Sequence, residues 1–203
     1  MSGTGRPLTE RVTIEGVEFT VTLTPGDGIG LLALHASVEG GTGELADELA
    51  QRCGATRLVF RQSDGEPVHI PSARMGAVPC RLLRDFLARV DVVVSLHGHL
   101  RPAAPRSIFL GGADRTAPRL MAGGLASLRP RFEPVTDLAL IPAALRGVNP
   151  RNPVNMAGGS GVQVELPLLA RTTFPGGADV PPRDVADALA DGVRRLRALT
   201  REA

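Results

Sequence analysis

The chain has 203 residues, 43% of them hydrophobic, which is enough for one domain with a buried core but short for two. Its formal net charge is only +2, and aromatic residues make up 3% of it. These values argue against a nucleic-acid-binding module, because single-strand binding uses aromatic platforms within a basic groove. No apolar run reaches the roughly 20 residues needed to span a bilayer, so we do not expect a membrane protein.

The N-terminal segment and the cysteines predict the compartment. Residues 1–11 are polar and lack the apolar stretch of a signal peptide, which predicts a cytoplasmic protein. Cys53 and Cys80 form no Cys-x-x-Cys pair, which excludes a cysteine-based zinc site. We therefore expect two free thiols in a reducing compartment. Separately, we expect a monomer or weak homo-oligomer.

The first half of the chain is predicted to contain strands and helices in alternation. Residues 11–24 alternate between polar and apolar side chains, which predicts an antiparallel hairpin or a long edge strand. Residues 26–28 have turn composition, and the apolar run 31–34 is typical of a strand buried on both faces. A helix over 44–52 is expected to end at Gly54. The next predicted elements are a strand over 56–61, a helix from 79 to about 89, and a buried strand over 91–96.

The second half continues the same alternation. The pattern predicts a strand over 107–110, a helix over 117–125, irregular chain over 142–155, a strand over 162–166 and a last helix from 181 to about 200. Alternating strands and helices indicate the α/β class: one domain over 1–203 with a mixed, mostly parallel sheet flanked by helices. The antiparallel N-terminal segment predicts a mixed edge.

Three polar residues stand at or near the ends of predicted strands. His35 follows the strand over 31–34, His97 follows the strand over 91–96, and Glu165 lies near the end of the strand over 162–166. Ligand sites in α/β sheets lie beyond the carboxyl ends of the strands, so these residues are expected on one edge. A lone histidine there is more often structural. Glu39, four residues after His35 in the same loop, and the distant His97 change that balance, because a catalytic zinc needs a few protein ligands and one open position.

Glu165 lies between Val164 and Leu166 on a strand that is predicted to be buried. A buried glutamate is costly unless it is paired or functional. It is either an edge residue that faces solvent or a general base that passes a proton from water to a leaving nitrogen. Spacing alone leaves both alternatives open.

Five segments resemble the poly-γ-glutamate hydrolase family, and they occur in the order expected there. The first resembles the first metal-binding motif, the third the second histidine motif, and the last the late block that carries a glutamate. The segments are LALHASVEGGTGELADELA (32–50), VHIPSARM (68–75), DVVVSLHGH (91–99), SIFLGGAD (107–114) and NPVNMAGGSGVQVELP (152–167).

The resemblance implies a compact fold related to zinc carboxypeptidases and one Zn²⁺ per chain. Its ligands would be His35, Glu39 and His97, with Glu165 as the general base. The implied reaction is hydrolysis of γ-glutamyl amide bonds in poly-γ-glutamate or a related acidic peptide. The loop between His35 and Glu39 is one residue shorter than in the family, and its glycines are replaced.

The resemblance also implies residues that contact an anionic substrate. Asn155 is followed by methionine where relatives often have arginine, so we expect nearby Arg151 to bind the carboxylate in its place. His69 lies in a matching motif and is a candidate for the site lining. Arg74 and Arg106 are further candidate contacts.

Two functional hypotheses remain beside a weaker nucleic-acid hypothesis. The first is an active zinc amidohydrolase. The alternative is an inactive, metal-bearing protein that binds acidic peptides or cell-wall fragments. The presence of Glu165 favours the enzyme. His99 is expected to face solvent or to serve as an auxiliary polar group.

Overall fold

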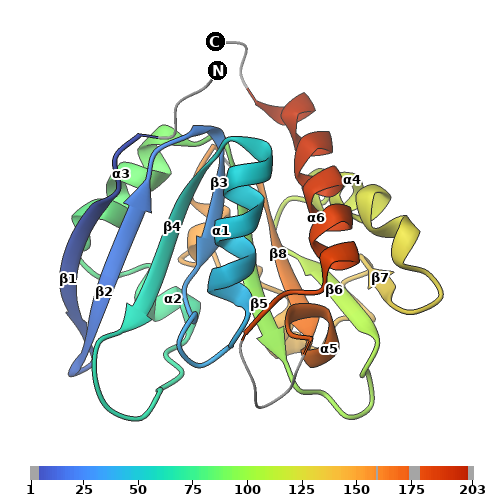
Figure 1. The fold of residues 1–203 in the computed structure, drawn as a ribbon, viewed down its shortest axis with the longest axis horizontal. Helices are drawn as coiled ribbons and strands as arrows, with labels where there is room; N and C mark the ends of the chain where they lie inside the picture. The colour runs from blue at the N-terminus through green and yellow to red at the C-terminus, as the bar shows by residue number, and fades with distance from the viewer. Residues whose placement is uncertain (1–4, 159, 174–178, 201–203) are drawn as a thin grey trace.

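The strands of the computed structural model, which describes residues 5–158, 160–173 and 179–200, form one sheet (Figure 1). It has eight strands in the order β1-β2-β4-β3-β5-β8-β6-β7. The strands are β1 Leu8–Ile14, β2 Val17–Thr24, β3 Asp27–Ala33, β4 Ala55–Gln62, β5 Val92–His99, β6 Ser107–Gly111, β7 Glu133–Val135 and β8 Ser160–Pro167.

The middle of the sheet is parallel, whereas antiparallel strands flank it. β3 pairs in parallel with β4 on one side and with β5 on the other, and β5 pairs in parallel with β8. β2 joins β4 and β6 joins β8 in antiparallel pairs. The predicted mixed α/β sheet is confirmed, and of the two alternatives for the N-terminal segment the antiparallel hairpin is the one that forms. Because β4 and β5 lie on opposite sides of β3, the strand order reverses there, and such reversals are where α/β sheets bind ligands.

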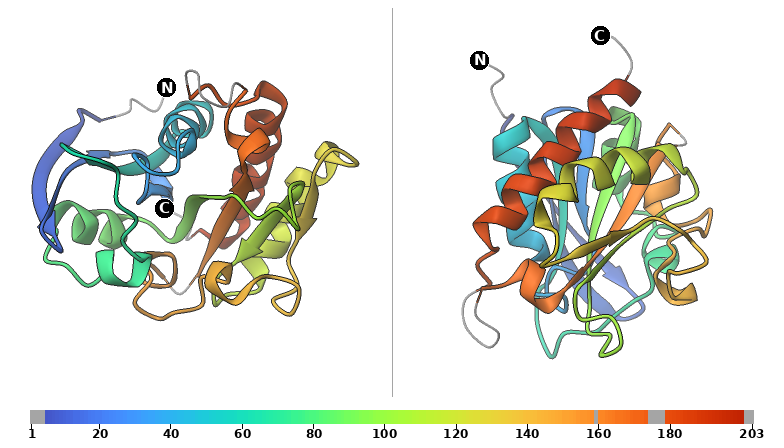
Figure 2. Two further views of the ribbon diagram at one scale, coloured as in Figure 1. Left: turned by 90° about the horizontal axis from the view of Figure 1, so that it is seen from below. Right: turned by 90° about the vertical axis from the view of Figure 1, so that its right-hand side faces the viewer.

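Helices cover both faces of the sheet. α1, α4 and α6 pack on one face and α3 on the other, as Figure 2 shows for α1, α6 and α3. Alternate residues of β5 serve the two layers: Val94 packs with the first group of helices and Val93 with α3. The helices are α1 Thr42–Cys53, α2 Ser72–Met75, α3 Arg81–Arg89, α4 Thr116–Gly124, α5 Leu168–Arg171 and α6 Arg183–Arg195, with 3₁₀ turns η1 Leu125–Leu128, η2 Ala143–Leu145, η3 Pro153–Asn155 and η4 Leu196–Leu199.

Several strands and helices begin or end at residues other than those predicted. β3 already begins at Asp27, inside the predicted turn, and β5 runs on to His99, beyond its apolar stretch. α3 begins at Arg81, because the side chain of Cys80 caps it by accepting a hydrogen bond from the backbone N–H of Leu83. α2, β7 and α5 are too short to produce a sequence period and were not predicted.

The helices have moderate lengths and mixed polarity. Within the described ranges, none is both long and apolar enough to cross a membrane. Cys53 and Cys80 are free thiols, as expected, and both are buried. The cytoplasmic location stays a prediction.

Candidate active site

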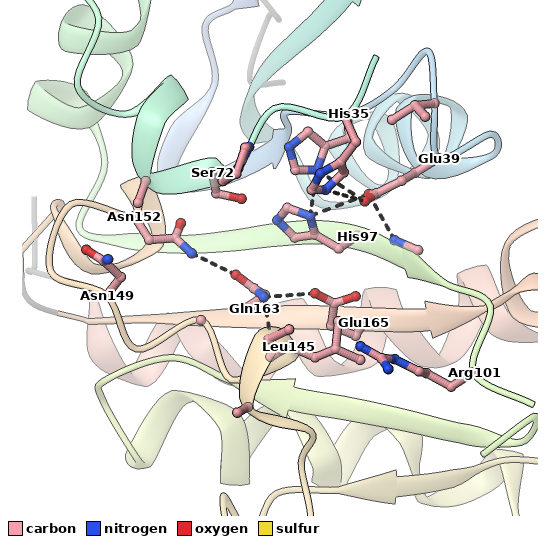
Figure 3. A pocket seen from close by; sticks show the side chains of 18 of the residues that line it. His35, Glu39, Ser72, His97, Arg101, Leu145, Asn149, Asn152, Gln163 and Glu165 are labelled. Carbon is pink, nitrogen blue, oxygen red and sulfur yellow. Dashed lines mark hydrogen bonds and ion pairs between the residues drawn. The ribbon is translucent and has the colours of Figure 1, made fainter. Parts of the chain in front are cut away.

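A pocket of about 680 Å³ lies at the carboxyl ends of β3, β5 and β8 (Figure 3). His35, Glu39, His97 and Glu165 all line it. The expectation that His35, His97 and Glu165 share one edge of the sheet is therefore confirmed. The rest of the wall comes from the chain around Ser72, from the β5–β6 connection and from the loop before β8.

His35 and Glu39 are brought together by a single tight turn that follows β3. The backbone N–H of Glu39 donates to the carbonyl oxygen of His35 at 2.8 Å. Gly41 then caps α1 with φ at 88°, and a side chain there would meet the carbonyl oxygen of Arg171. Glycine is thus required by both conformation and space. This turn aligns two side chains four residues apart, which explains how the shortened loop still presents both.

His97 and Glu165 are neighbours because of strand register. His97 was expected to follow its strand, but it lies within β5, where it pairs with Glu165 of β8. In parallel strands, such paired residues point to the same face. The backbone N–H of Gly98 also donates to Oε2 of Glu39 at 3.0 Å, which ties the turn after β3 to β5.

The ligand atoms of His35, Glu39 and His97 converge. The two Nδ1 atoms are 3.1 Å apart, Nδ1 of His35 is 3.2 Å from Oε1 of Glu39, and Nδ1 of His97 is 3.4 Å from Oε2. Zinc bonds of about 2.0–2.1 Å in a tetrahedron place neighbouring ligand atoms about 3.3 Å apart. The three residues are buried and could hold a metal ion. Their spacing fits zinc.

The outer nitrogens of both histidines have partners that fix the rings. Nε2 of His35 lies 2.8 Å from the carbonyl oxygen of Ile70, which can only accept, so Nε2 carries the proton and Nδ1 is left with its lone pair in the neutral ring. Nε2 of His97 lies 2.8 Å from Oγ of Ser95. Such outer hydrogen bonds orient histidine ligands in metal sites.

The charge of Glu39 is strongly stabilised. Burial by itself would raise its pKa, but the charges and hydrogen bonds of His97 and His35 outweigh burial and hold the pKa well below its usual range. Glu39 is therefore an ionised carboxylate, the form that binds a metal.

Glu165 is a buried carboxyl on the other side of the pocket. Burial, followed by the charge of Glu39, raises its pKa to about 8, although Gln163, His35 and Arg101 act in the opposite direction. Nε2 of Gln163 donates to Oε1 of Glu165 at 2.8 Å, and Oε1 of Gln163 accepts from Asn152 at 2.8 Å. Since β8 lies inside the sheet and Glu165 is only 4% exposed, the alternative of a solvent-facing edge residue is wrong.

The raised pKa of Glu165 predicts how the stability of the metal-free protein depends on pH. The folded protein holds a proton that the unfolded chain releases above its ordinary pKa of 4.5, so the free energy of unfolding falls as the pH rises from 4.5 to 8. Glutamine at position 165 does not titrate, so the Glu165→Gln variant keeps this part of the free energy of unfolding, which is on the order of a few kcal/mol.

We therefore expect Glu165→Gln to gain in melting temperature relative to wild type as the pH is raised from about 5 to about 8, in the presence of a chelator. Thermal unfolding of both proteins at several pH values checks this. Because all other titrating groups are shared, parallel curves for the two proteins would contradict the assigned pKa.

The residues expected to contact substrate fall into two groups. His69 lines the pocket, with Nε2 3.7 Å from Oε1 of Glu39, as expected. Arg74 points away, because it forms an ion pair with Glu15 at the end of the first hairpin. Arg106 and the exposed Arg151 also do not line this pocket.

Asn155 holds neighbouring loop segments together and does not line the pocket. Its Oδ1 accepts from the backbone N–H of Ala113, and its Nδ2 donates to the carbonyl oxygens of Gly147 and Asn149. All of its polar atoms are thus engaged in holding chain segments together. Of the two asparagines in this sequence block, Asn152, three residues earlier, is the one that lines the pocket.

Sequence reasoning missed Gln163, Asn152, Arg101 and Arg171 as pocket residues. Gln163 had a signal: it lies two residues before Glu165 on a buried strand and so shares its face. The buried Arg171 had none. Its guanidinium lies over Gly98 and donates to the carbonyl oxygen of Gly40, thereby bracing the turn that carries Glu39.

His99 was expected to face solvent or to be an auxiliary polar group. It is 5% exposed, because its ring packs beside Phe109 and its Nε2 bonds the carbonyl oxygen of Ser107. The solvent-facing alternative is therefore wrong. It lies apart from the three-residue cluster and links β5 to the start of β6.

Comparison with solved structures finds proteins of similar fold. Bacteriophage poly-gamma-glutamate hydrolase is similar in fold, with a TM-score of 0.71 and 21% identity over 91% of this chain and 92% of that one. YNDL in a zinc-free form gives a TM-score of 0.69 and 22% identity over 94% and 89% of the chains. A putative carboxypeptidase from Burkholderia mallei gives 0.57 and 10% over 98% and 65%.

A search of curated proteins found no match. At these identities the structural likenesses concern the fold, which is that of carboxypeptidase-like hydrolases. The family comparison covers most of the sequence. Since the model of the poly-gamma-glutamate hydrolase family matches residues 9–184, this chain belongs to that family.

Proposed function

We propose that the protein is a zinc-dependent amide hydrolase that cleaves γ-glutamyl bonds of poly-γ-glutamate or a related acidic peptide. His35, Glu39 and His97 hold one Zn²⁺, and Glu165 is the general base. The observation that carries the proposal is the convergence of three buried ligand atoms beside a buried carboxyl group in one pocket. Membership of the family supports the substrate class.

The ligand set leaves one side of the cluster facing the pocket, as a catalytic metal site requires. When bound, zinc supplies a Lewis acid that polarises the scissile carbonyl group and lowers the pKa of water. The chain supplies the rest: Glu39 contributes a negative charge, and the two histidines contribute neutral nitrogens that their outer partners keep aimed inward.

Glu165 moves the proton. Its Oε1 is engaged by Gln163, which leaves Oε2 to take a proton from the attacking water. The water oxygen bonds to the carbonyl carbon, the C–N bond then breaks, and Glu165 delivers the proton to the leaving nitrogen. The base must be ionised to start, and a dication held nearby would bring its pKa down from about 8 toward neutral pH.

The pocket also suits an anionic substrate. Arg101 extends toward Glu165 from the β5–β6 connection (Figure 3), and its side chain lines the pocket. A guanidinium can bind a carboxylate through two hydrogen bonds. Asn149 and Asn152 add amide groups on the opposite wall. We infer that these groups replace the contacts first expected from Arg74 and Arg151.

Gln163→Ala is expected to lower kcat by about tenfold and to shift the acidic limb of the pH–rate profile to higher pH. The amide of Gln163 stabilises the ionised form of Glu165, so its loss raises the pKa of the base. Steady-state rates between about pH 5 and 9 check this. Gln51→Ala, an exposed position on α1, is the matched control, and an unshifted profile in Gln163→Ala would refute the contact's role.

The deciding test of the proposed function is turnover. Purified protein is incubated with zinc and poly-γ-glutamate, and the polymer size and new amino groups are followed over time, with α-linked polyglutamate in parallel. Shortening of the γ-linked polymer is the expected result. Tight binding without cleavage at high protein concentration would favour an inactive binding protein and overturn the enzyme.

A further inference from the structure

We propose that a groove continues from the active-site pocket, past Arg101 and Arg106, and binds further residues of a γ-linked acidic polymer. The groove is formed by the β5–β6 connection and α5, which lie at the lower edge of the sheet in Figure 1. The inference rests on the proposed function for its ligand. It adds a second binding region, outside the pocket that holds the metal-site residues.

Three pockets along this side of the molecule share lining residues. Leu100 and Arg101 line both the active-site pocket and a neighbouring pocket of about 220 Å³. Pro105 and Leu169 line this second pocket and also a third one of about 290 Å³, which contains Arg106 and Arg131. Because neighbouring pockets share lining residues, we infer that they adjoin along one path from Glu165 to Arg106.

The floor of the groove, which consists of leucine and proline side chains, is apolar. Leu100 is 71% exposed and Leu169 is 56% exposed, although both are large apolar side chains beside a catalytic pocket. Prolines at 102, 105 and 167 complete an apolar, conformationally restricted surface. Adjacent exposed apolar side chains that line a cleft indicate a binding surface.

Arginine side chains lie along the rim of the groove. Arg101 stands at the start of the groove, and Arg106 is exposed with no ion-pair or hydrogen-bond partner for its side chain among the described residues. Arg131 lies over the ring of Phe132 and forms an ion pair with Asp184, so part of its charge is already balanced. Arg106 is therefore a rim cation whose charge is available to a ligand, whereas the charge of Arg131 is partly balanced.

An apolar floor with a cationic rim matches one polymer chemistry. A γ-linked glutamyl chain carries two methylene groups of each residue in its backbone and a carboxylate directly on that backbone. The methylenes can lie on the leucine and proline floor while the carboxylates reach the arginines. In an α-linked chain, the carboxylates are at the ends of side chains and the backbone is a row of amides, which an apolar floor disfavours.

The test measures binding separately from cleavage. The measurements use the zinc-loaded Glu165→Gln variant, in which cleavage is expected to be strongly slowed. Its affinity for short and long fluorescent γ-glutamyl oligomers is measured by fluorescence anisotropy at several salt concentrations. We expect longer oligomers to bind more tightly, and Arg106→Glu in this background to weaken binding of the long oligomer about tenfold, an effect that shrinks with salt. Leu169→Ser is expected to weaken it as well.

Arg84→Glu is the control, since it makes the same charge change at an exposed site on α3, across the sheet. If Arg106→Glu binds no more weakly than Arg84→Glu, or if affinity does not rise with length, the groove is overturned even when the wild type cleaves the polymer. If the binding results are as expected but the wild type never cleaves the polymer, the proposed groove is supported and the proposed enzymatic function is refuted. Equal affinity for α- and γ-linked oligomers would overturn the role of the apolar floor.

Discussion

Replacing Glu165 with glutamine is expected to lower kcat for poly-γ-glutamate by about 10²–10⁴-fold and to leave the bound metal in place. Glutamine keeps the size of the side chain and can still bond Gln163, but it cannot take a proton from water. Because Glu165 is outside the three-residue cluster, the ligands are untouched. Initial rates and elemental mass spectrometry on the same protein check both parts.

The control for Glu165→Gln is Glu66→Gln, which makes the same change in an exposed loop. It should match the wild type in rate and in metal content. A Glu165→Gln protein that retains more than about a tenth of the wild-type kcat would rule out the general base assigned here. A protein that loses its metal would instead place Glu165 among the ligands.

His35→Ala and His97→Ala are expected to abolish metal binding and, with it, activity. Each change leaves two protein ligands where about three are needed for a catalytic zinc site. It also removes a histidine whose charge and hydrogen bond stabilise the charge of the buried Glu39. Elemental analysis after dialysis against zinc should give about one zinc per chain for the wild type and a small fraction of that for each variant.

Loss of a buried histidine could act through stability alone, and His99→Ala controls for this. His99 is also buried on β5, but its ring bonds the carbonyl oxygen of Ser107, away from the cluster. It should keep its zinc, and circular dichroism should show all three variants folded. Full zinc occupancy in folded His35→Ala would show that the metal site lies elsewhere.

Local sequence patterns determined most of the secondary structure. Two-residue alternation marks the first hairpin, continuous apolar runs mark the buried strands, and glycine at 54 ends α1 as expected. His35 and Glu39 could be paired from sequence because one turn of chain joins them. Glu165 could be singled out because a carboxyl group among apolar strand residues needs a reason to be there.

Only the tertiary structure decided which distant residues meet. The 3.1 Å separation of Nδ1 atoms in His35 and His97 depends on the pairing of β3 with β5, and the position of His97 beside Glu165 depends on the register of β5 and β8. A shift by one residue would turn one of these side chains to the opposite face. Nothing local fixes that register.

The roles of the arginines could not be predicted from the sequence either. Arg74 pairs with Glu15, and Arg171 braces the turn after β3, yet neither has a neighbour in sequence that reveals its role. Long, charged side chains take the direction that their distant partners allow, and those partners are set by how loops pack on the finished sheet. The sequence therefore determined the chemistry available to this protein, and packing over long separations decided which of those groups share a site.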